Sequence, residues 1–138
     1  MMRSHQNSIV LILLSVVACT SLAKEAVLQT VELTEADHFL EGAGFNLTKD
    51  KNGCVLRGVG YSESGKREYV FRFNKYGIKT AHYIESRYAV PIYIDNNAKI
   101  VTTEKVSYQK DPKNNEAFKT LFNELKRLIT QGNLARCH

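Results

Sequence analysis

REYVFRFNKYGIKTAHYIES, residues 67–86, is the stretch of the chain that decides the fold. Two runs of strand-forming residues flank residues 74–77 (NKYG), whose glycine can adopt the positive φ that a tight hairpin requires. Tyr69, Phe71 and Phe73 alternate with polar or smaller residues, which is typical of a half-buried antiparallel strand. A lone hairpin is only marginally stable in water, so we expect further strands and a helix over its apolar face.

Turn-forming residues recur between apolar, β-prone runs along the chain. Residues 50–53 (DKNG), 62–65 (SESG) and 95–98 (DNNA) resemble the turn at 74–77 in composition. This spacing predicts an up-and-down antiparallel meander, and residues 24–33 are expected to form an extended or loosely ordered lead-in. The predicted strands are 45–49, 54–61, 67–73, 78–86, 89–94 and 99–108.

Two features of this meander stay open. Pro91 lacks a backbone donor, so the strand 89–94 is expected at a sheet edge or with a bulge. The register after the turn at 74–77 is not fixed by the pattern. A slip of one residue would exchange which pair, Thr80 and His82 or Ala81 and Tyr83, faces Phe71.

A short helix is predicted near the amino end of the domain. Thr34 followed by Asp37 resembles a capping box, apolar residues follow at helical spacing, and glycines at 42 and 44 end the segment. Its polar side carries four titratable groups, Glu35, Asp37, His38 and Glu41. We interpret them as a solvated helix face, with general acid or base chemistry as the alternative.

The carboxyl-terminal helix has clearer boundaries. Asp111 is its expected N-cap, Pro112 its first residue and Gly132 its end. One apolar stripe at helical spacing predicts that this helix covers the sheet. The stripe consists of Phe118, Leu121, Phe122, Leu125, Leu128 and Ile129. The predicted fold class is therefore α+β: a five- to six-stranded antiparallel meander, with a short N-terminal and a longer C-terminal helix on one face.

Residues 1–23 have the pattern of an export signal. Arg3 precedes an apolar run at residues 9–17, and Ser21-Leu22-Ala23 suits cleavage before Lys24. Residues 16–19 (VVAC) resemble a bacterial lipobox, so the alternative is a lipoprotein signal of residues 1–18 with Cys19 lipidated. Residues 24–138 are then one exported domain, periplasmic or secreted, and membrane-anchored only if Cys19 carries lipid.

Two cysteines remain in that domain. Cys54 and Cys137 form an even pair, which predicts a disulfide in an oxidising compartment. The bond would attach the end of the C-terminal helix to the sheet. No HExxH, CxxC, GxSxG or glycine-rich phosphate motif occurs in the sequence, so we expect no metal, no cofactor and no recognisable catalytic machinery.

Tyrosine alternates with arginine and lysine on the predicted strands, and both tyrosine and arginine are enriched at interface hot spots. The candidate binding residues are Arg57, Tyr61, Tyr69, Arg72, Tyr83, Arg87 and Tyr88. Such a face could bind a protein or an anionic component of the cell envelope. Export argues against nucleic acid as the partner. The alternative interpretation is that tyrosine is present simply as a good strand former.

These observations favour a non-enzymatic binding protein, such as an inhibitor, an immunity-type protein or an envelope accessory protein. One alternative is a carrier that holds a small amphiphile between the sheet and its helices. The other is a small hydrolase that uses the polar face of the first helix beside His82.

Overall fold

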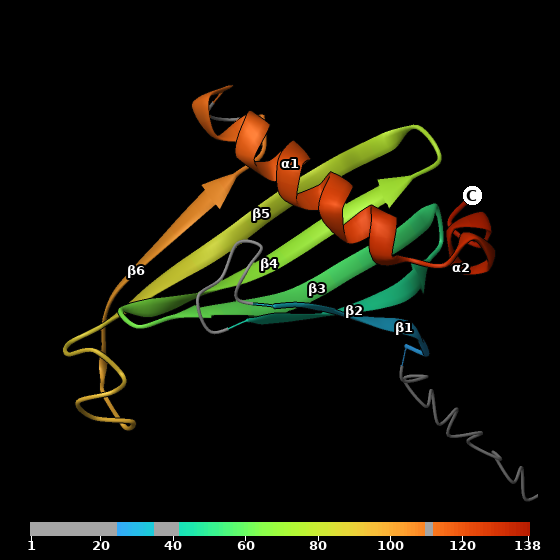
Figure 1. Ribbon diagram of the computed structural model, residues 1–138. Coiled ribbons are helices and arrows are strands. Elements are labelled where there is room, and N and C mark those ends of the chain that lie inside the picture. Colours follow the sequence, from blue (N-terminus) through green and yellow to red (C-terminus); the bar gives the residue numbers. More distant parts are fainter. Residues whose placement is uncertain (1–24, 35–41, 110–111) are drawn as a thin grey trace, which may run out of the picture.

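The computed structural model describes residues 25–34, 42–109 and 112–138. Within these ranges the chain forms six strands and two helices (Figure 1). They are β1 (Val27–Leu33), β2 (Ala43–Asp50), β3 (Gly53–Ser62), β4 (Gly65–Asn74), β5 (Gly77–Tyr88), β6 (Ile100–Ser107), α1 (Pro112–Leu128) and α2 (Gln131–Ala135). Each strand pairs antiparallel with the next, in the order β1-β2-β3-β4-β5-β6. The predicted α+β class and meander are confirmed, with six strands in the sheet.

The strands themselves differ from the prediction at two places. Residues 27–33, expected as a lead-in, form β1 because Val31 and Leu33 pair with Phe45 and Ala43 of β2 and are buried there. Residues 89–94, expected as a strand, form a loop. Ile92 N–H donates to Glu63 O in the β3–β4 turn instead of to a sheet partner.

The short helix predicted from Thr34 to Gly44 is not shown. Residues 35–41, with Glu35, Asp37, His38 and Glu41, lie outside the described residues, as do the expected cap Asp111 and the export signal with Cys19. Ala43 and Gly44, predicted as the end of that helix, belong to β2 and pair with Leu33 and Glu32.

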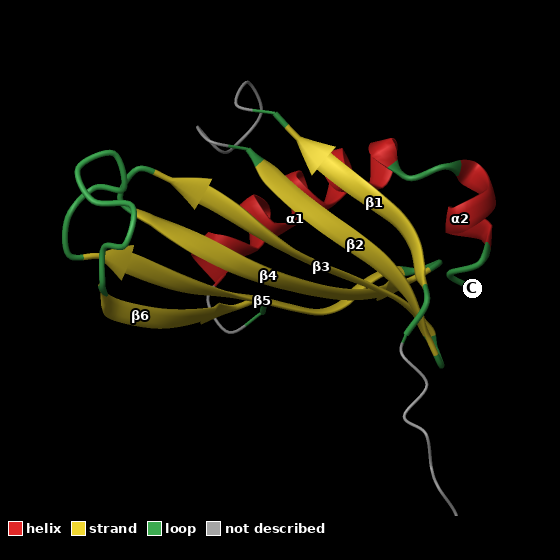
Figure 2. Cartoon of the chain, turned by 90° about the horizontal axis from the view of Figure 1, so that it is seen from below, coloured by secondary structure: helices red, strands yellow, loops and turns green. Residues whose placement is uncertain are grey.

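The hydrophobic core lies between α1 and one face of the sheet, which we call the helix-covered face. Figure 2 shows both helices on this single side. Phe71 packs its ring against Phe118 and Phe122 of α1, with centroids 6.1 and 5.7 Å apart, and Phe73 lies 5.0 Å from Phe122. Five of the six predicted stripe residues are buried, but Leu128 is 48% exposed. That part of the prediction is wrong because Leu128 lies at the edge of the stripe, whereas Ile129, just beyond the end of α1, is buried.

Gln29 of β1 explains where α1 ends. Its side-chain nitrogen donates to Leu128 O at 2.8 Å, and its side-chain oxygen accepts from Thr130 N at 3.0 Å. Both bonds satisfy backbone groups that a helix terminus leaves unpaired. Thr130 then caps α2, so Gly132 lies inside this second helix and does not end the first one.

The predicted disulfide is confirmed. Cys54 at the start of β3 and Cys137 beyond α2 are bonded, with a Cα–Cα distance of 5.0 Å and a sequence separation of 83. Both residues are buried. Among the described helices, none is long and apolar enough to cross a membrane.

The register also settles which residues share a face. Phe71 pairs with Ala81 and Tyr69 with Tyr83, so Ala81 and Tyr83 lie on the helix-covered face. His82 therefore lies on the opposite face, which we call the open face. An irregularity between Arg72 and Phe73, where the partners step from Thr80 to Ile78, sets this register.

Candidate functional site

A pocket of about 530 Å³ lies at the end of the sheet where the β3–β4 turn meets the end of β5. We call it the end pocket. Its walls contain three cationic side chains, one carboxylate, two tyrosines and several small residues. They are Gly60, Tyr61, Ser62, Ser64, Gly65, Lys66, Arg67, Glu85, Ser86, Arg87 and Tyr88.

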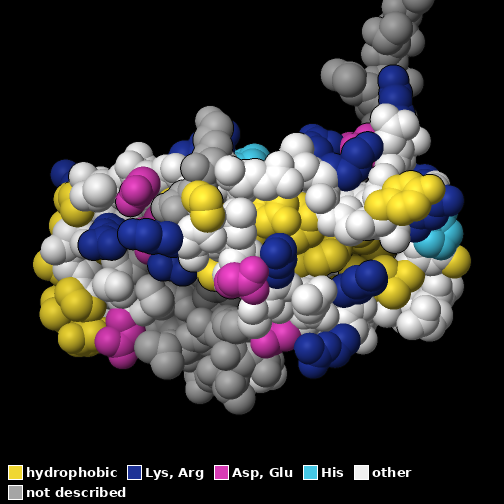
Figure 3. Space-filling model, turned by 90° about the horizontal axis from the view of Figure 1, so that it is seen from above, with side chains coloured by type: hydrophobic (Ala, Val, Ile, Leu, Met, Phe, Trp, Pro, Cys, Tyr) yellow, Lys and Arg dark blue, Asp and Glu magenta, His cyan; other side chains and the backbone are white. Residues whose placement is uncertain are grey.

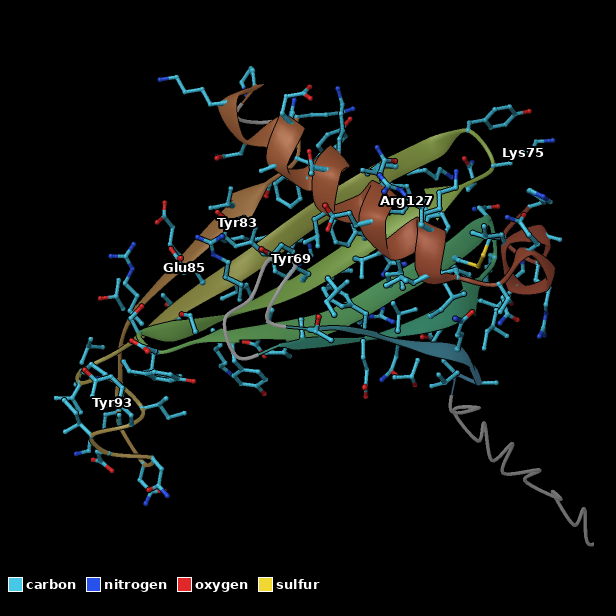
Figure 4. The ribbon with its side chains drawn as sticks, viewed as in Figure 1. Tyr69, Lys75, Tyr83, Glu85, Tyr93 and Arg127 are labelled. Atoms are coloured by element: carbon cyan, nitrogen blue, oxygen red, sulfur yellow. A yellow bond between two sulfur atoms is a disulfide. The ribbon has the colours of Figure 1, made fainter. Side chains whose placement is uncertain are left out.

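The pairing of β4 with β5 explains why the pocket is polar. Along the helix-covered face the cross-strand pairs run from Phe71–Ala81 through Tyr69–Tyr83 to Arg67–Glu85 and Gly65–Arg87. The aromatic core thus ends at the two tyrosines, and charged pairs follow. Tyr83 and Glu85 project from the same side of β5, with Tyr69 on the neighbouring strand (Figure 4).

Glycine helps to shape this end of the sheet. A Cβ atom built on Gly65 would lie 2.1 Å from Ser86 O, so no side chain fits there. Gly60, which pairs with Arg67, also contributes no side chain. Both glycines are buried, so they add no side chain to the pocket, and Gly65 allows the backbone of β5 to pack closely against it.

Arg67 is held in a fixed position by three neighbours. Its Nε and Nη2 atoms lie 3.0 and 2.9 Å from Glu85 Oε1, and its guanidinium carbon lies 5.0 Å from the centre of the Tyr83 ring. Burial disfavours the charged form, but hydrogen bonds with Tyr69 and Glu85 outweigh it and raise the pKa of Arg67. Arg67 is therefore a permanently charged and oriented group.

Tyr69 supports this arrangement from inside the core. Its ring is buried and stacks on Phe71, with centroids 6.0 Å apart. Burial raises the pKa of the Tyr69 hydroxyl, and the hydrogen bond with Arg67 partly opposes that shift. Tyr69 stays neutral and serves to position Arg67.

Glu85 connects Arg67 to Arg87. Arg87 Nη2 lies 3.6 Å from Glu85 Oε2, and the Arg87 side chain is 66% exposed. A single carboxylate thus faces two arginines, and the third cation, Lys66, pairs at 3.5 Å with Glu68, which does not line the pocket. The end pocket carries more positive than negative charge.

An exposed apolar segment adjoins the pocket. Residues 89–101, which follow Tyr88, include five large apolar side chains that face solvent: Val90, Tyr93, Ile94, Ile100 and Val101. We call this stretch the apolar segment. It projects from the sheet in Figure 1, and hydrophobic side chains gather at the same end of the molecule, on the left, in Figure 3.

Backbone hydrogen bonds hold the apolar segment in place. Tyr88 N donates to Ser64 O at 2.9 Å and Ile92 N to Glu63 O at 3.0 Å, which joins the segment to the β3–β4 turn. Ala89 N donates to Lys99 O at 2.8 Å and closes its base. The predicted turn at 95–98 is present, with Ala98 N donating to Asp95 O at 3.0 Å.

The seven predicted binding residues do not share one face. Tyr61, Arg87 and Tyr88 line the end pocket. Tyr69 and Tyr83 belong to the helix-covered face and pack against each other, with ring centroids 5.2 Å apart.

The other two predicted residues lie on the open face. Arg57 pairs with Glu25 at 3.0 Å and Arg72 with Asp50 at 2.8 Å, so each arginine is matched by one carboxylate.

Sequence reasoning missed Lys66, Arg67 and Glu85 as pocket residues. The signal available was the position of Gly65 next to two cations at a turn, but the partner of Arg67 depends on a register that the pattern does not fix.

The described residues bear on the two alternatives only in part. The first-helix groups of the hydrolase hypothesis lie outside them, and His82 is on the open face, away from α1. No cluster of three or more His, Cys, Asp or Glu side chains that could hold a metal ion is found in the described ranges. For the carrier, the contacts of Phe71, Phe118 and Phe122 fill the space between α1 and the middle of the sheet.

No protein-family model matches the chain, and no curated protein or solved structure shows significant similarity to it.

Proposed function

We propose that this protein is an exported, non-enzymatic binding protein that recognises a partner protein through the apolar segment, residues 89–101. The observation that supports the proposal most strongly is the exposure of Tyr93 (70%), Ile94 (65%) and Val101 (63%) in one short stretch. Burial of apolar side chains is favourable by about 25 cal/mol of free energy for each Å² of surface removed from water. An exposed apolar patch of this kind is typical of an interaction site.

The segment is also prepared for binding. Its backbone is fixed by hydrogen bonds to the β3–β4 turn, so less conformational freedom is lost when a partner docks. Tyr93 offers a rigid aromatic ring with a polar hydroxyl, which is the chemistry favoured at interface hot spots. The cationic end pocket beside it adds a polar rim.

A pull-down with matched variants tests the proposal. The bait is the purified protein, the extract comes from the envelope of the source cells, and the variant is Tyr93→Ser/Ile94→Ser. Tyr76→Ser is the control, because Tyr76 is 85% exposed in the β4–β5 turn at the opposite end of the molecule. We expect a partner that binds the wild type and the control but binds the double variant at least tenfold more weakly.

Two results would contradict the proposal. One is a partner that binds all three proteins equally, which would place its contact surface elsewhere. The other is the recovery of lipid without any protein, which would favour the carrier of a small amphiphile.

Export is part of the proposal and has its own test. The Cys54–Cys137 disulfide is compatible with an oxidising compartment. The mass of the protein isolated from its source distinguishes a chain that begins at Lys24 from one that begins at an acylated Cys19. A mass that includes residues 1–18 would contradict both forms of processing.

A further inference from the structure

The end pocket differs from the other arginine sites in its charge balance. Arg57 and Arg72 on the open face each have one carboxylate at 3.0 Å or less. In the end pocket, Glu85 is the shared partner of Arg67 and Arg87. One carboxylate cannot neutralise both arginines, whereas Lys66 has its own carboxylate in Glu68, at 3.5 Å.

We propose that the end pocket binds a small molecule that carries a carboxylate or phosphate group. This site is separate from the apolar segment and does not require the partner protein. Arg87 is the ligand-binding cation, and Arg67 is the oriented group at the back of the pocket.

The geometry of the two arginines supports these roles. Arg67 directs Nε and Nη2 to Glu85 and lies against the Tyr83 ring, so its position does not change when a ligand enters. Arg87 makes only a long contact of 3.6 Å with Glu85 and is largely exposed, so its fork of donors can turn to an incoming anion at little cost. Guanidinium groups bind carboxylate and phosphate oxygens in pairs, through charge-assisted hydrogen bonds.

The pocket residues other than the arginines can accommodate the uncharged part of such a ligand. Gly60 and Gly65 add no side chain that would fill the pocket, and Tyr61, which is 42% exposed, offers a ring for an apolar or sugar portion. A volume of about 530 Å³ falls within the range of small-molecule sites, roughly 300–1,000 Å³. The pocket is therefore large enough for more than the anionic group alone.

Titration of the purified protein with inorganic phosphate and with citrate tests the proposal. The buffer is low in salt and contains no other oxyanion, and binding is followed by NMR shifts of the backbone amides of residues 60–67 and 85–88. The variant is Arg87→Ala, and the control is Arg127→Ala, because Arg127 is an exposed arginine on α1 (Figure 4). Arg87→Gln, which keeps a polar side chain, is a second variant in case Arg87→Ala does not fold.

We expect saturable binding of at least one probe, weakened about tenfold or more by Arg87→Ala and unchanged by Arg127→Ala. Saturation by phosphate alone or by citrate alone identifies which of the two anions the natural ligand carries. Absence of saturation with both probes, or equal weakening by the two variants, would overturn the proposal. Tyr93→Ser/Ile94→Ser should still bind the anion, so this result is independent of the partner experiment.

Discussion

Cys54 and Cys137 are bonded to each other across 83 residues, and this bond attaches the end of the chain to the first residues of β3. Lys49 on the adjacent strand donates to the backbone oxygens of Arg136 and His138, so the terminus is held from two sides. The disulfide restricts the unfolded chain, and for a loop of this length the chain-entropy model assigns it about 4 kcal/mol.

The double variant Cys54→Ala/Cys137→Ala should therefore lower the free energy of unfolding by about 2–5 kcal/mol. Denaturant titration of the wild type and the variant, both followed by circular dichroism, measures the difference. The double variant is preferable to a single one, because a single replacement leaves a buried free thiol. A loss below about 1 kcal/mol would contradict a stabilising role for the bond.

Leu125 and Leu128 provide a matched pair on α1. Leu125 is fully buried against the sheet, whereas Leu128 is half exposed beside the contact with Gln29. Leu125→Ala should destabilise the protein by about 2–5 kcal/mol, since it removes buried methyl groups and leaves a cavity. Leu128→Ala should destabilise the protein far less. Similar losses for both variants in thermal unfolding would mean that α1 does not cover the sheet as described.

Gly58 and Gly44 provide a second pair, on neighbouring strands. A Cβ atom on Gly58 would lie 2.3 Å from Gly44 O and 2.5 Å from the ring of Phe45, which covers this glycine. Gly58→Ala should therefore lower stability by about 1–3 kcal/mol through overpacking. A Cβ atom on Gly44 meets nothing within 4 Å, so Gly44→Ala should be neutral or slightly stabilising. Equal midpoints of denaturation for the two variants would contradict the packing of Phe45 over β3.

Local sequence was sufficient to predict the elements that depend on short-range signals. Three signals can be recognised from residues close together in the sequence: the turn at 74–77, the alternation of Tyr69, Phe71 and Phe73, and the apolar stripe on α1. The even cysteine pair was sufficient for the disulfide, because only one pairing of Cys54 and Cys137 is possible once residues 1–23 are set aside.

The predictions of strands were wrong where the structure depends on pairing with segments that are distant in the sequence. Residues 27–33 carry a weak pattern and become a strand through pairing with β2. Residues 89–94 are strongly β-prone, but their backbone bonds to the β3–β4 turn and finds no strand beside it. Strand propensity describes fit to a sheet, so it cannot decide which segment has a neighbour.

The end pocket could not be predicted for a related reason. Arg67 and Glu85 meet only in the register set by the irregularity between Arg72 and Phe73. A shift of one residue would move Glu85 to the open face and leave Arg67 without its carboxylate. The residue types indicated a binding surface, but which of these residues lie together can be known only from the strand register.

His82 on the open face allows a prediction about pH. Burial, together with the positive charges of Lys105 and Arg72, lowers the pKa of His82 below its ordinary value of 6.5. In the window between that value and the lowered one, the unfolded chain binds more protons at this residue than the folded protein does. By linkage, the contribution of His82 to the free energy of unfolding is fully present above pH 6.5 and is lost as the pH falls through the window.

Thermal unfolding of the wild type and of His82→Gln, measured between about pH 5 and 8, checks this sign. The wild type should lose more stability on acidification than the variant, which has no group to protonate at this position. The effect should be modest, since the imidazole is partly open to solvent and water screens the two cations. Identical pH dependence in the two proteins would mean that folding does not lower the pKa of His82, and a steeper dependence in His82→Gln would reverse the direction of the shift.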